Sequence, residues 1–290
     1  MKTKDWLAFV ALGLAWGSSF LWIKIAVQET GPFTLVGLRL LFGILGLLLV
    51  VAYSRPAWPS ERRMWAILGV IGVTNTAIPF VLISWGEVHI DSALAAVLNS
   101  TVPLFTMVIA HLALSDDRLT PSRLAGLLVG FGGIVVLLSR DLLSGSQNNL
   151  LGQGAVLLAA IFYAASSVYA RREARGVSPI VHALVPLLVA DATIWLVTPI
   201  VEAPISIPRL PLTWLALAWL GLVGSCLAYL LFFYLLHSIG PTRTTLVTYI
   251  FPLVGVALGV IFLGELLDWH LFVGASLVVG SIAVVNSRAG

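Results

Sequence analysis

The chain has 290 residues, of which 59% are hydrophobic and only 10% are charged, with a formal net charge of +3. Soluble domains carry roughly 25% charged residues, so this composition excludes an ordinary soluble protein and indicates a membrane protein. The apolar residues form long continuous runs instead of alternating with polar ones. This pattern excludes a membrane β-barrel and predicts membrane-spanning helices.

Ten apolar segments are close to the roughly 20 residues that a helix needs to cross the hydrocarbon core. In the first half they cover Trp6–Lys24, Thr34–Tyr53, Met64–Gly86, Ser92–Leu114 and Pro121–Ser139. In the second half they cover Leu151–Ala170, Ile180–Val201, Leu212–Leu236, Thr244–Leu263 and Trp269–Asn286. We therefore expect an all-α integral membrane protein with ten transmembrane helices.

The two halves share a weak internal repeat of constant spacing. Six residues recur 149 positions later, where Trp65, Leu68, Gly72, Leu82, Pro103 and Leu104 match Trp214, Leu217, Gly221, Leu231, Pro252 and Leu253. Five predicted spans separate each pair, and five crossings reverse the direction of the chain in the bilayer. The sequence thus predicts two five-helix repeats of inverted topology, at residues 1–140 and 151–290, joined by a linker at residues 141–150. Inverted repeats are typical of secondary transporters.

The basic residues of the loops predict the orientation. With the N-terminus inside, twelve of the 16 Lys and Arg residues fall on the inner side, three on the outer side, and Arg39 lies within a helix. Cytoplasmic loops carry such an excess, so both termini are expected in the cytoplasm. Because the arginines follow the topology of the loops, the positive net charge needs no nucleic-acid partner.

Polar and aromatic residues in the middle of the spans are candidates for a central cavity, where a transporter binds its substrate. The set without a charge is Trp16, Ser19, Asn75, Asn99, Thr101, Tyr163, Ser167, Tyr229 and Tyr249. A cavity of this kind suits a small neutral or zwitterionic solute with an apolar part. For each Ser and Thr the alternative stays open that the hydroxyl bonds its own backbone or serves close helix packing.

Two charged residues are also placed within spans. Arg39 lies about 8 Å and Asp191 about 12 to 15 Å below the outer end, at 1.5 Å per helical residue. They form a pair, or they face the cavity separately, with Arg39 binding a substrate carboxylate and Asp191 an amine or a proton. For Arg39, snorkelling to the lipid headgroups is the competing interpretation.

Other residues have structural interpretations. Pro103 and Pro252 are candidate hinges because both repeats have a proline there, although fixed kinks are an equal alternative. Asp116 and Glu265 precede the last helix of each half and are interpreted as partners of its N-terminal dipole. Glu87, His89 and Asp91 have two interpretations, a cation site in the outer loop and a solvated polar turn, and the turn is favoured.

The opening Trp16-Gly17-Ser18-Ser19, the Leu38-Arg39-Leu40 of the second span, the two prolines and Leu263-Gly264-Glu265 together resemble the EamA branch of the drug/metabolite transporter superfamily. One departure is Leu114-Ser115-Asp116, where the family often has Leu-Gly-Glu. The resemblance implies a ten-helix carrier of the cell inner membrane, and many such carriers export amino acids and other small metabolites.

We therefore expect a secondary transporter that moves small organic metabolites, amino acids above all, outward by alternating access around a polar and aromatic cavity. The alternatives are a membrane-embedded enzyme and a sensor or scaffold without transport. No catalytic arrangement, metal site or cofactor motif is recognisable, so we expect no enzyme, no metal and no cofactor. The expected partners are a small-molecule substrate and the lipid bilayer, and the expected state is a monomer.

Overall fold

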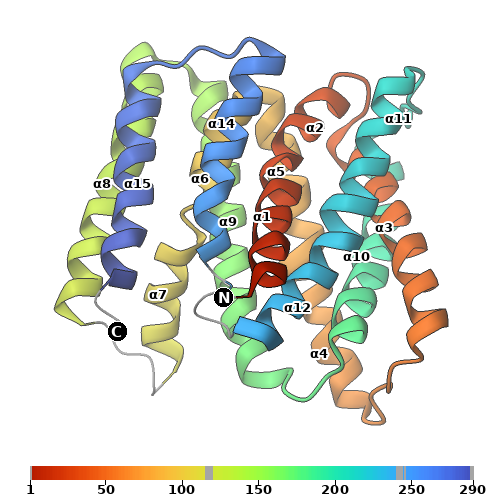
Figure 1. Cartoon of the computed structure of the whole chain (residues 1–290). Helices are drawn as coiled ribbons and strands as arrows, with labels where there is room; N and C mark the ends of the chain where they lie inside the picture. The colour runs from red at the N-terminus through yellow and green to blue at the C-terminus, as the bar shows by residue number, and fades with distance from the viewer. Residues whose placement is uncertain (1, 115–119, 240–243, 245, 288–290) are drawn as a thin grey trace.

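The computed structural model describes residues 2–114, 120–239, 244 and 246–287, and its regular elements there are helices (Figure 1). The first half contains α1 (Thr3–Gly17), α2 (Ser19–Ala26), α3 (Pro32–Ser54), α4 (Arg62–Gly72), the π-helical η1 (Val73–Ala77), α5 (Ile78–His89), α6 (Ser92–Asn99), α7 (Val102–Ala113) and α8 (Pro121–Ser144). The second half contains α9 (Gln147–Glu173), α10 (Pro179–Val201), α11 (Pro211–Ala218), the π-helical η2 (Trp219–Leu227), α12 (Ala228–Ile239), the 3-10 helix η3 (Leu246–Tyr249), α14 (Ile250–Leu263) and α15 (Trp269–Ser287).

Eight helical stretches are long and apolar enough to cross a membrane within the described residues. They are Thr3–Ala26, Pro32–Ser54, Arg62–His89, Ser92–Ala113, Pro121–Ser144, Gln147–Glu173, Pro179–Val201 and Pro211–Phe232. Two shorter apolar helices follow, Ile250–Leu263 and Trp269–Ser281. The prediction of a helical membrane protein is confirmed. The helices on either side of the predicted linker are longer than expected, since α8 continues five residues further, to Ser144, and α9 begins four residues earlier, at Gln147. Helix α5 also continues three residues further, to His89.

Four of the long stretches are interrupted near their middle. Ser18 separates α1 from α2, and Ser100 with Thr101 separates α6 from α7. The hydroxyls of these last two residues donate to the main-chain carbonyls of Val97 and Leu98, which competes with regular helical bonding. The third and eighth spans instead contain π-helical turns, which often occur at functional sites.

Helices of the two halves pack against each other along the whole molecule. Helix α1 contacts α12 and α14, α3 contacts α10 and η2, α5 contacts α9, and α8 contacts α15. Gly133 of α8 and Gly274 of α15 allow these two helices to approach closely, since a Cβ on Gly133 would lie 2.9 Å from the carbonyl oxygen of Gly274. Small residues at such contacts are the usual means of packing helices in membranes.

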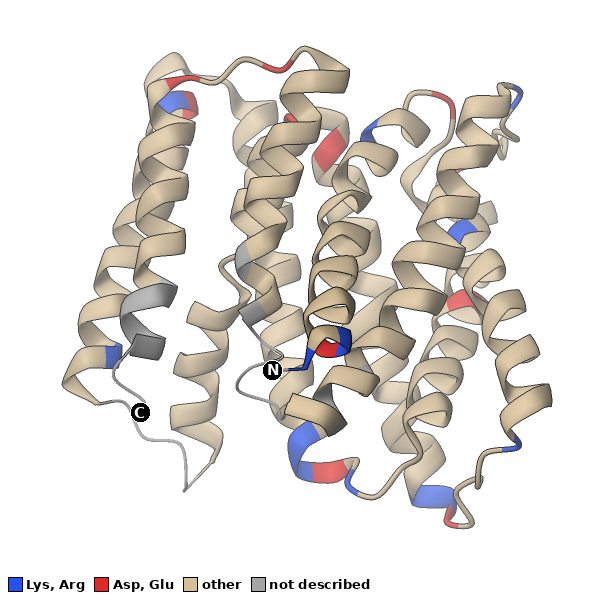
Figure 2. Cartoon of the chain, viewed as in Figure 1, with Lys and Arg blue, Asp and Glu red and all other residues tan. Residues whose placement is uncertain are grey.

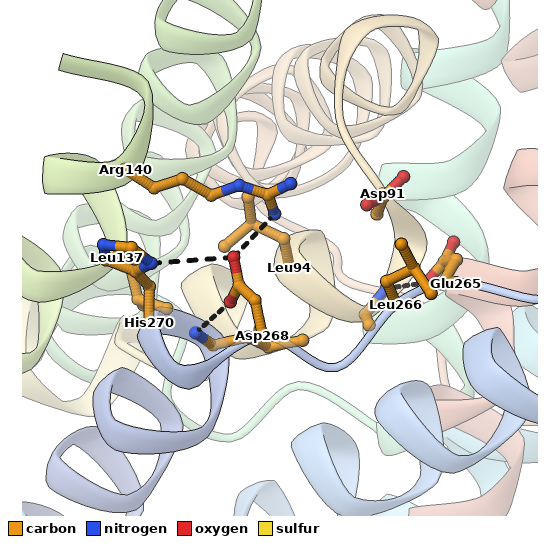
Figure 3. Close-up of a pocket in the computed structure, with 10 residues that line it drawn as sticks. Asp91, Leu94, Leu137, Arg140, Glu265, Leu266, Asp268 and His270 are labelled. Carbon is orange, nitrogen blue, oxygen red and sulfur yellow. Dashed lines mark hydrogen bonds and ion pairs between the residues drawn. The ribbon is translucent and has the colours of Figure 1, made fainter. Parts of the chain in front are cut away.

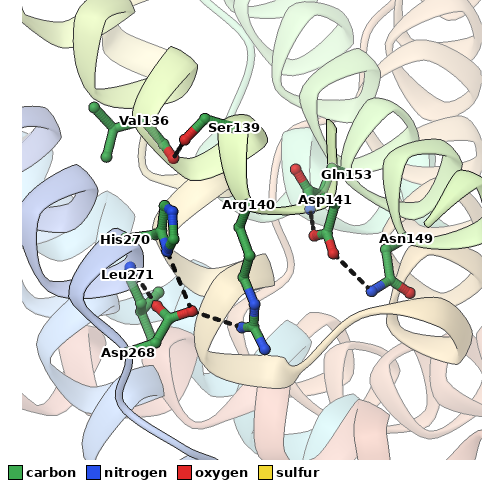
Figure 4. Close-up of polar contacts among 9 residues, drawn as sticks. All are labelled: Val136, Ser139, Arg140, Asp141, Asn149, Gln153, Asp268, His270 and Leu271. Carbon is green, nitrogen blue, oxygen red and sulfur yellow. Dashed lines mark hydrogen bonds and ion pairs between the residues drawn. The ribbon is translucent and has the colours of Figure 1, made fainter. Parts of the chain in front are cut away.

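The segment predicted as the linker is a tight helical corner. Helix α8 ends at Ser144, Gly145 has a positive φ of 72°, and α9 begins at Gln147. The carboxylate of Asp141 accepts a hydrogen bond from the Asn149 amide at 3.0 Å and another from the amide of Gln153 (Figure 4). These two bonds join the end of α8 to the start of α9.

We call the end of the helix array at the top of Figure 1, where α11 and α15 begin, the upper end, and the opposite end the lower end. Figure 2 shows most of the blue Lys and Arg positions toward the lower end. The loop charges predict that this end faces the cytoplasm.

Candidate functional site

Arg39 is the central feature of the site because its charge is buried without a counter-ion. The residue is 4% exposed and lies in α3, facing η2 of the second half. Its Nε is 3.4 Å from the Ser225 hydroxyl, and its guanidinium carbon is 3.9 Å from the centre of the Phe80 ring. No ion pair to Arg39 occurs within the described part of the chain. Arg39 therefore does not snorkel to the headgroups.

Four predicted cavity residues surround the same region. Tyr163 of α9 and Tyr229 of α12 are close enough to Arg39 to interact with it electrostatically. Trp16 of α1 donates from Nε1 to the carbonyl of Gly224 at 3.1 Å, and its ring meets Tyr229 edge to face at 6.3 Å. The hydroxyl of Ser19 lies 3.1 Å from the position that a Cβ on Gly224 would take. The structure thus brings Trp16, Ser19, Arg39, Tyr163 and Tyr229 together.

The local structure of η2 explains how α3 comes so close to it. Ser225 donates its hydroxyl hydrogen to the carbonyl of Leu220, five residues earlier, which follows the π-helical spacing. A Cβ on Gly221 would lie 2.5 Å from the carbonyl oxygen of Arg39. Because only glycine permits this approach, Gly221 sets the depth at which the Arg39 side chain meets Ser225.

The predicted hydroxyl residues mostly bond main-chain carbonyls. Ser19 donates to Ala15 at 3.2 Å, and Thr101 donates to Leu98 at 2.6 Å. Ser167 is exposed and donates to the carbonyl of its own turn, at Tyr163. Its neighbour Ser166 is the buried one and pairs with Thr74 across the two halves at 3.1 Å. Sequence periodicity alone did not select between the two adjacent serines.

The two predicted asparagines lie near the interruptions of their spans. Asn75 is half-buried in the π-helical η1, and Asn99 is half-buried at the end of α6. The side-chain oxygen of Asn99 is buried without a hydrogen-bond partner. Buried amide oxygens are normally satisfied, so Asn99 stays a candidate for contact with a ligand.

Asp191 does not pair with Arg39, and the structure corrects this interpretation. It lies half-buried on α10, one turn before Trp195, and its carboxyl group is close to the indole N–H of that residue. Trp195 packs at Gly37 of α3, where a Cβ would lie 2.7 Å from the ring. Asp191 therefore belongs to the contact between α10 and α3.

The remaining predicted positions lie next to helix breaks. Pro103 is in the first turn of α7, directly after the break at Ser100 and Thr101. Pro252 is the third residue of α14, directly after η3. Hinge motion at the two prolines stays a prediction. The side chain of Tyr249 and the whole of Asp116 lie outside the described residues.

The sequence interpretation of Glu87 as part of a solvated turn was wrong, and its burial was missed. Helix α5 continues to His89, and Glu87 is completely buried with neither carboxylate oxygen in a hydrogen bond. Next to it, Gly86 packs at the backbone of Gly152, where a Cβ would lie 2.9 Å from the carbonyl oxygen. A signal for this burial was the adjacent glycine, which is typical of a close helix contact in membranes.

Glu265 caps a different helix from the one that the sequence suggested. It accepts hydrogen bonds from the main-chain N–H groups of Ser92 at 2.7 Å and Ala93 at 2.9 Å, at the start of α6. The start of α15 is instead capped by Asp268, which accepts from the N–H of Leu271 at 2.7 Å. The carboxylate reaches α6 because the loop between α14 and α15 passes above it (Figure 3).

A pocket at the upper end lies apart from Arg39 and the other predicted cavity residues. It is lined by α6, the end of α8 and the loop before α15, and Asp268 pairs there with Arg140 at 2.9 Å (Figure 3). None of the predicted cavity residues lines it. We therefore locate the candidate site around Arg39 and not in this pocket.

Comparisons with known proteins agree with a transporter. The model of the EamA-like transporter family matches residues 4–139 and again residues 150–287. The chain is 30% identical to an uncharacterized inner membrane transporter, YedA, of Escherichia coli K12, covering 96% of this chain and 89% of that protein. It is 22% identical to an uncharacterized transporter, YoaV, of Bacillus subtilis, covering 95% and 94%. A solved crystal structure has the same fold, with a TM-score of 0.69, 22% identity and 98% coverage of both chains.

Proposed function

Since the chain belongs to the EamA-like transporter family and is a multi-pass protein of the inner membrane, we propose that it is a secondary transporter exporting small organic metabolites, with amino acids the favoured class. The observation that carries this proposal is the buried guanidinium of Arg39, which has no carboxylate partner in the described structure. A buried cation is costly unless it is paired, so an anionic group of a ligand is the natural partner.

The geometry of the guanidinium favours a carboxylate as that group. Arginine has five N–H donors in a planar fork that matches a carboxylate in a bidentate manner. Only one of them contacts a described side chain, at the long distance of 3.4 Å to Ser225. The rings of Phe80, Tyr163 and Tyr229 near Arg39 offer an apolar and aromatic surface for the rest of the substrate.

Alternating access is the second part of the proposal, and equivalent contacts in the two halves support it. Trp65 donates from Nε1 to the carbonyl of Pro59 at 3.0 Å, and Trp214 donates to Pro208 at 3.1 Å, with the same spacing of six residues. Likewise, a Cβ on Gly72 would lie 2.6 Å from the carbonyl oxygen of Pro186. A Cβ on Gly221, the equivalent glycine, would lie 2.5 Å from the carbonyl oxygen of Arg39. Such pairs favour two inverted five-helix repeats around a shared site.

Counterflow in proteoliposomes tests the proposal. Vesicles loaded with one unlabelled amino acid at a time should accumulate the same labelled amino acid transiently from outside. We expect Arg39→Lys, which keeps the charge but not the fork, to lower uptake roughly tenfold or more, as loss of a charged hydrogen bond would. Arg63→Lys is the matched control, because it makes the same substitution at a side chain that is 75% exposed.

Arg39→Met separates binding from folding, because it replaces the buried charge by an apolar side chain of similar length. Such replacements are often neutral or stabilising, so we expect a folded protein that no longer recognises carboxylates. Absence of counterflow for every amino acid and for other small carboxylates would contradict the transporter proposal and favour a sensor or scaffold.

A further inference from the structure

Glu87 occupies a position in which its carboxyl group has no hydrogen-bond partner among the described residues. It is fully buried, two residues and therefore about 3 Å before the end of α5, and both its oxygens are without hydrogen-bond partners. Transfer of an ionised carboxylate into an apolar interior without such bonds is strongly unfavourable, and a neutral carboxyl group is much cheaper to bury. The environment of Glu87 therefore favours its protonated form.

The charged and titratable groups around Glu87 do not supply the hydrogen bonds that its carboxylate lacks. From the elements packed against α5, and on α5 itself, they are Lys24 of α2, Arg39 of α3, Tyr163 of α9, Asp91 and Glu265 at the start of α6, and His89. The π-helical η1 contributes no titratable residue. None of these groups hydrogen-bonds the Glu87 carboxyl group.

Lys24 is the nearest cation, and its ammonium group is committed elsewhere. Its Nζ donates to the main-chain carbonyl of Glu87 at 2.7 Å and to that of Ile90 at 2.8 Å. Lys24 thereby satisfies the free carbonyls at the end of α5, where a positive charge is also favoured by the helix dipole.

Arg39 and Glu265 act on Glu87 from a greater distance. Arg39 stacks on Phe80, which is seven residues and so about 10 Å from Glu87 along α5. Glu265 is a carboxylate at the upper end whose oxygens accept hydrogen bonds from the N–H groups of Ser92 and Ala93. Glu87 lies on α5 between Phe80, on which Arg39 stacks, and the end of the helix next to the start of α6, which Glu265 caps.

We propose that Glu87 binds a proton when the upper end is closed and releases it when that end opens. The step is a plain proton transfer, in which the carboxyl O–H bond breaks and the proton passes to water that reaches the exposed carboxylate. That this proton is exchanged for substrate rests on the proposed function. The protonation itself does not require a substrate.

The closure that buries Glu87 depends on contacts between the two halves. Glu265 holds the start of α6 from the loop between α14 and α15, and α6 packs against the end of α5. When these contacts separate, water reaches the end of α5 and hydrates the carboxylate, whose proton affinity falls because the burial that disfavoured its charge is lost. Acid thus favours the closed upper end, and alkali favours the open one.

Asp141 provides a matched comparison within the same chain. It is also buried, at 5% exposure, but both of its oxygens accept hydrogen bonds from amides, one from Asn149 and one from Gln153. Hydrogen bonds of this kind stabilise the ionised form of a carboxylate. Replacement of Asp141 should therefore leave the proton-binding behaviour of the protein unchanged.

Infrared spectroscopy of the full chain in lipid nanodiscs, with the proton as the only ligand, tests the proposal. At neutral pH the wild type should show the C=O stretching band of a protonated carboxyl group. The band should be absent in Glu87→Gln, retained in Asp141→Asn, and displaced in Glu87→Asp, which keeps an acid at the position. Glu265→Ala should shift the titration of the band to lower pH, because it removes the contact that closes the upper end.

An identical band in the wild type and in Glu87→Gln would overturn the proposal, as would the absence of any such band. Glu87→Asp serves if the glutamine variant misfolds. A displaced C=O band in the folded aspartate variant assigns the band to the carboxyl group at position 87. The readout is independent of counterflow. A protein with the Glu87 band but no transport refutes the proposed function alone, whereas transport without the band refutes only this inference.

Discussion

The two ends of the helix array are joined across the halves by different kinds of contact. At the upper end three carboxylates, which we call the upper-end caps, each accept main-chain N–H groups at the start of a helix in the other half. They are Glu202 on α3, Glu265 on α6, and Glu29 on the residues that lead into α11. At the lower end Arg63 pairs with Glu173 at 2.6 Å, and Tyr234 donates to Asp5 at 3.1 Å.

This difference indicates which end is held closed. Main-chain N–H groups at a helix start have no partner within the helix and carry the positive end of its dipole, so a carboxylate there is bound by fixed donors. The pair of Arg63 and Glu173 joins two long side chains, one of them 75% exposed, and such pairs contribute little. The upper end is therefore the more firmly joined of the two.

The strongest test of this comparison is Glu202→Ala. Glu202 accepts from the N–H groups of Phe33 at 2.7 Å and Thr34 at 2.9 Å, and from the Thr34 hydroxyl at 2.8 Å. Loss of a charged hydrogen-bond acceptor costs roughly 1.5–3 kcal/mol, and we expect a destabilisation of about 2 kcal/mol. Denaturant unfolding in detergent, followed by tryptophan fluorescence, measures it.

Gly31→Ala is the matched variant for this cap. A Cβ on Gly31 would clash with the Glu202 carboxylate, so the substitution displaces the carboxylate without removing it. The two variants should therefore destabilise the protein to a similar degree, and the double variant should be less than additive because both act on one contact. Full additivity would show that Gly31 and Glu202 act independently.

Glu265→Gln should have the next largest effect. The glutamine keeps one oxygen for Ser92 or Ala93 but loses the charge and the second acceptor, so we expect about 1 kcal/mol, typical of an N-cap change. The same unfolding measurement applies. A loss no larger than that of the exposed lower-end pair of Arg63 and Glu173 would show that this cap does not join the halves more firmly.

The positions of the spans could be predicted from the sequence, because hydropathy and loop residues report directly on the solvent. Pro32, Pro121 and Pro179, for example, each stand at the start of a helix where a missing N–H is harmless. The family followed from the motif resemblance, and Trp16, Tyr163 and Tyr229 were candidates because they lie deep in their spans; the structure places them near Arg39.

The tertiary partners of the carboxylates could not be predicted in the same way. The position of Glu265 before α15 suggested a local cap, and only the path of its loop brings it to α6. Glu87 follows a predicted helix end, and its burial depends on the packing of α5 against α9. Arg39 and Asp191 have similar depths, but depth does not fix the direction in which a side chain leaves its helix.

Replacement of Glu29, the third of the upper-end caps, should destabilise the protein less, by an amount that depends on pH. The hydroxyl of Thr213 donates to Glu29 at 2.6 Å and, with the N–H groups of Leu210 and Arg209, lowers the pKa of this carboxyl below its usual 4.5. A lowered pKa means that the stabilisation is complete above pH 4.5 and is lost as the pH falls through the folded-state value. The difference in stability between wild type and Glu29→Gln should therefore be constant near neutrality and vanish in acid.

The smallest effect is expected at the lower end, for Arg63→Ala. An exposed pair of this kind is worth about 0–1 kcal/mol, because solvent screens the charges and two long side chains must be ordered. The unfolding midpoint should move less than in any upper-end variant, and salt should reduce the difference further. A loss as large as that of Glu202→Ala would mean that the lower end is joined as firmly as the upper, and the two ends would no longer differ in the way that makes one of them the closed end.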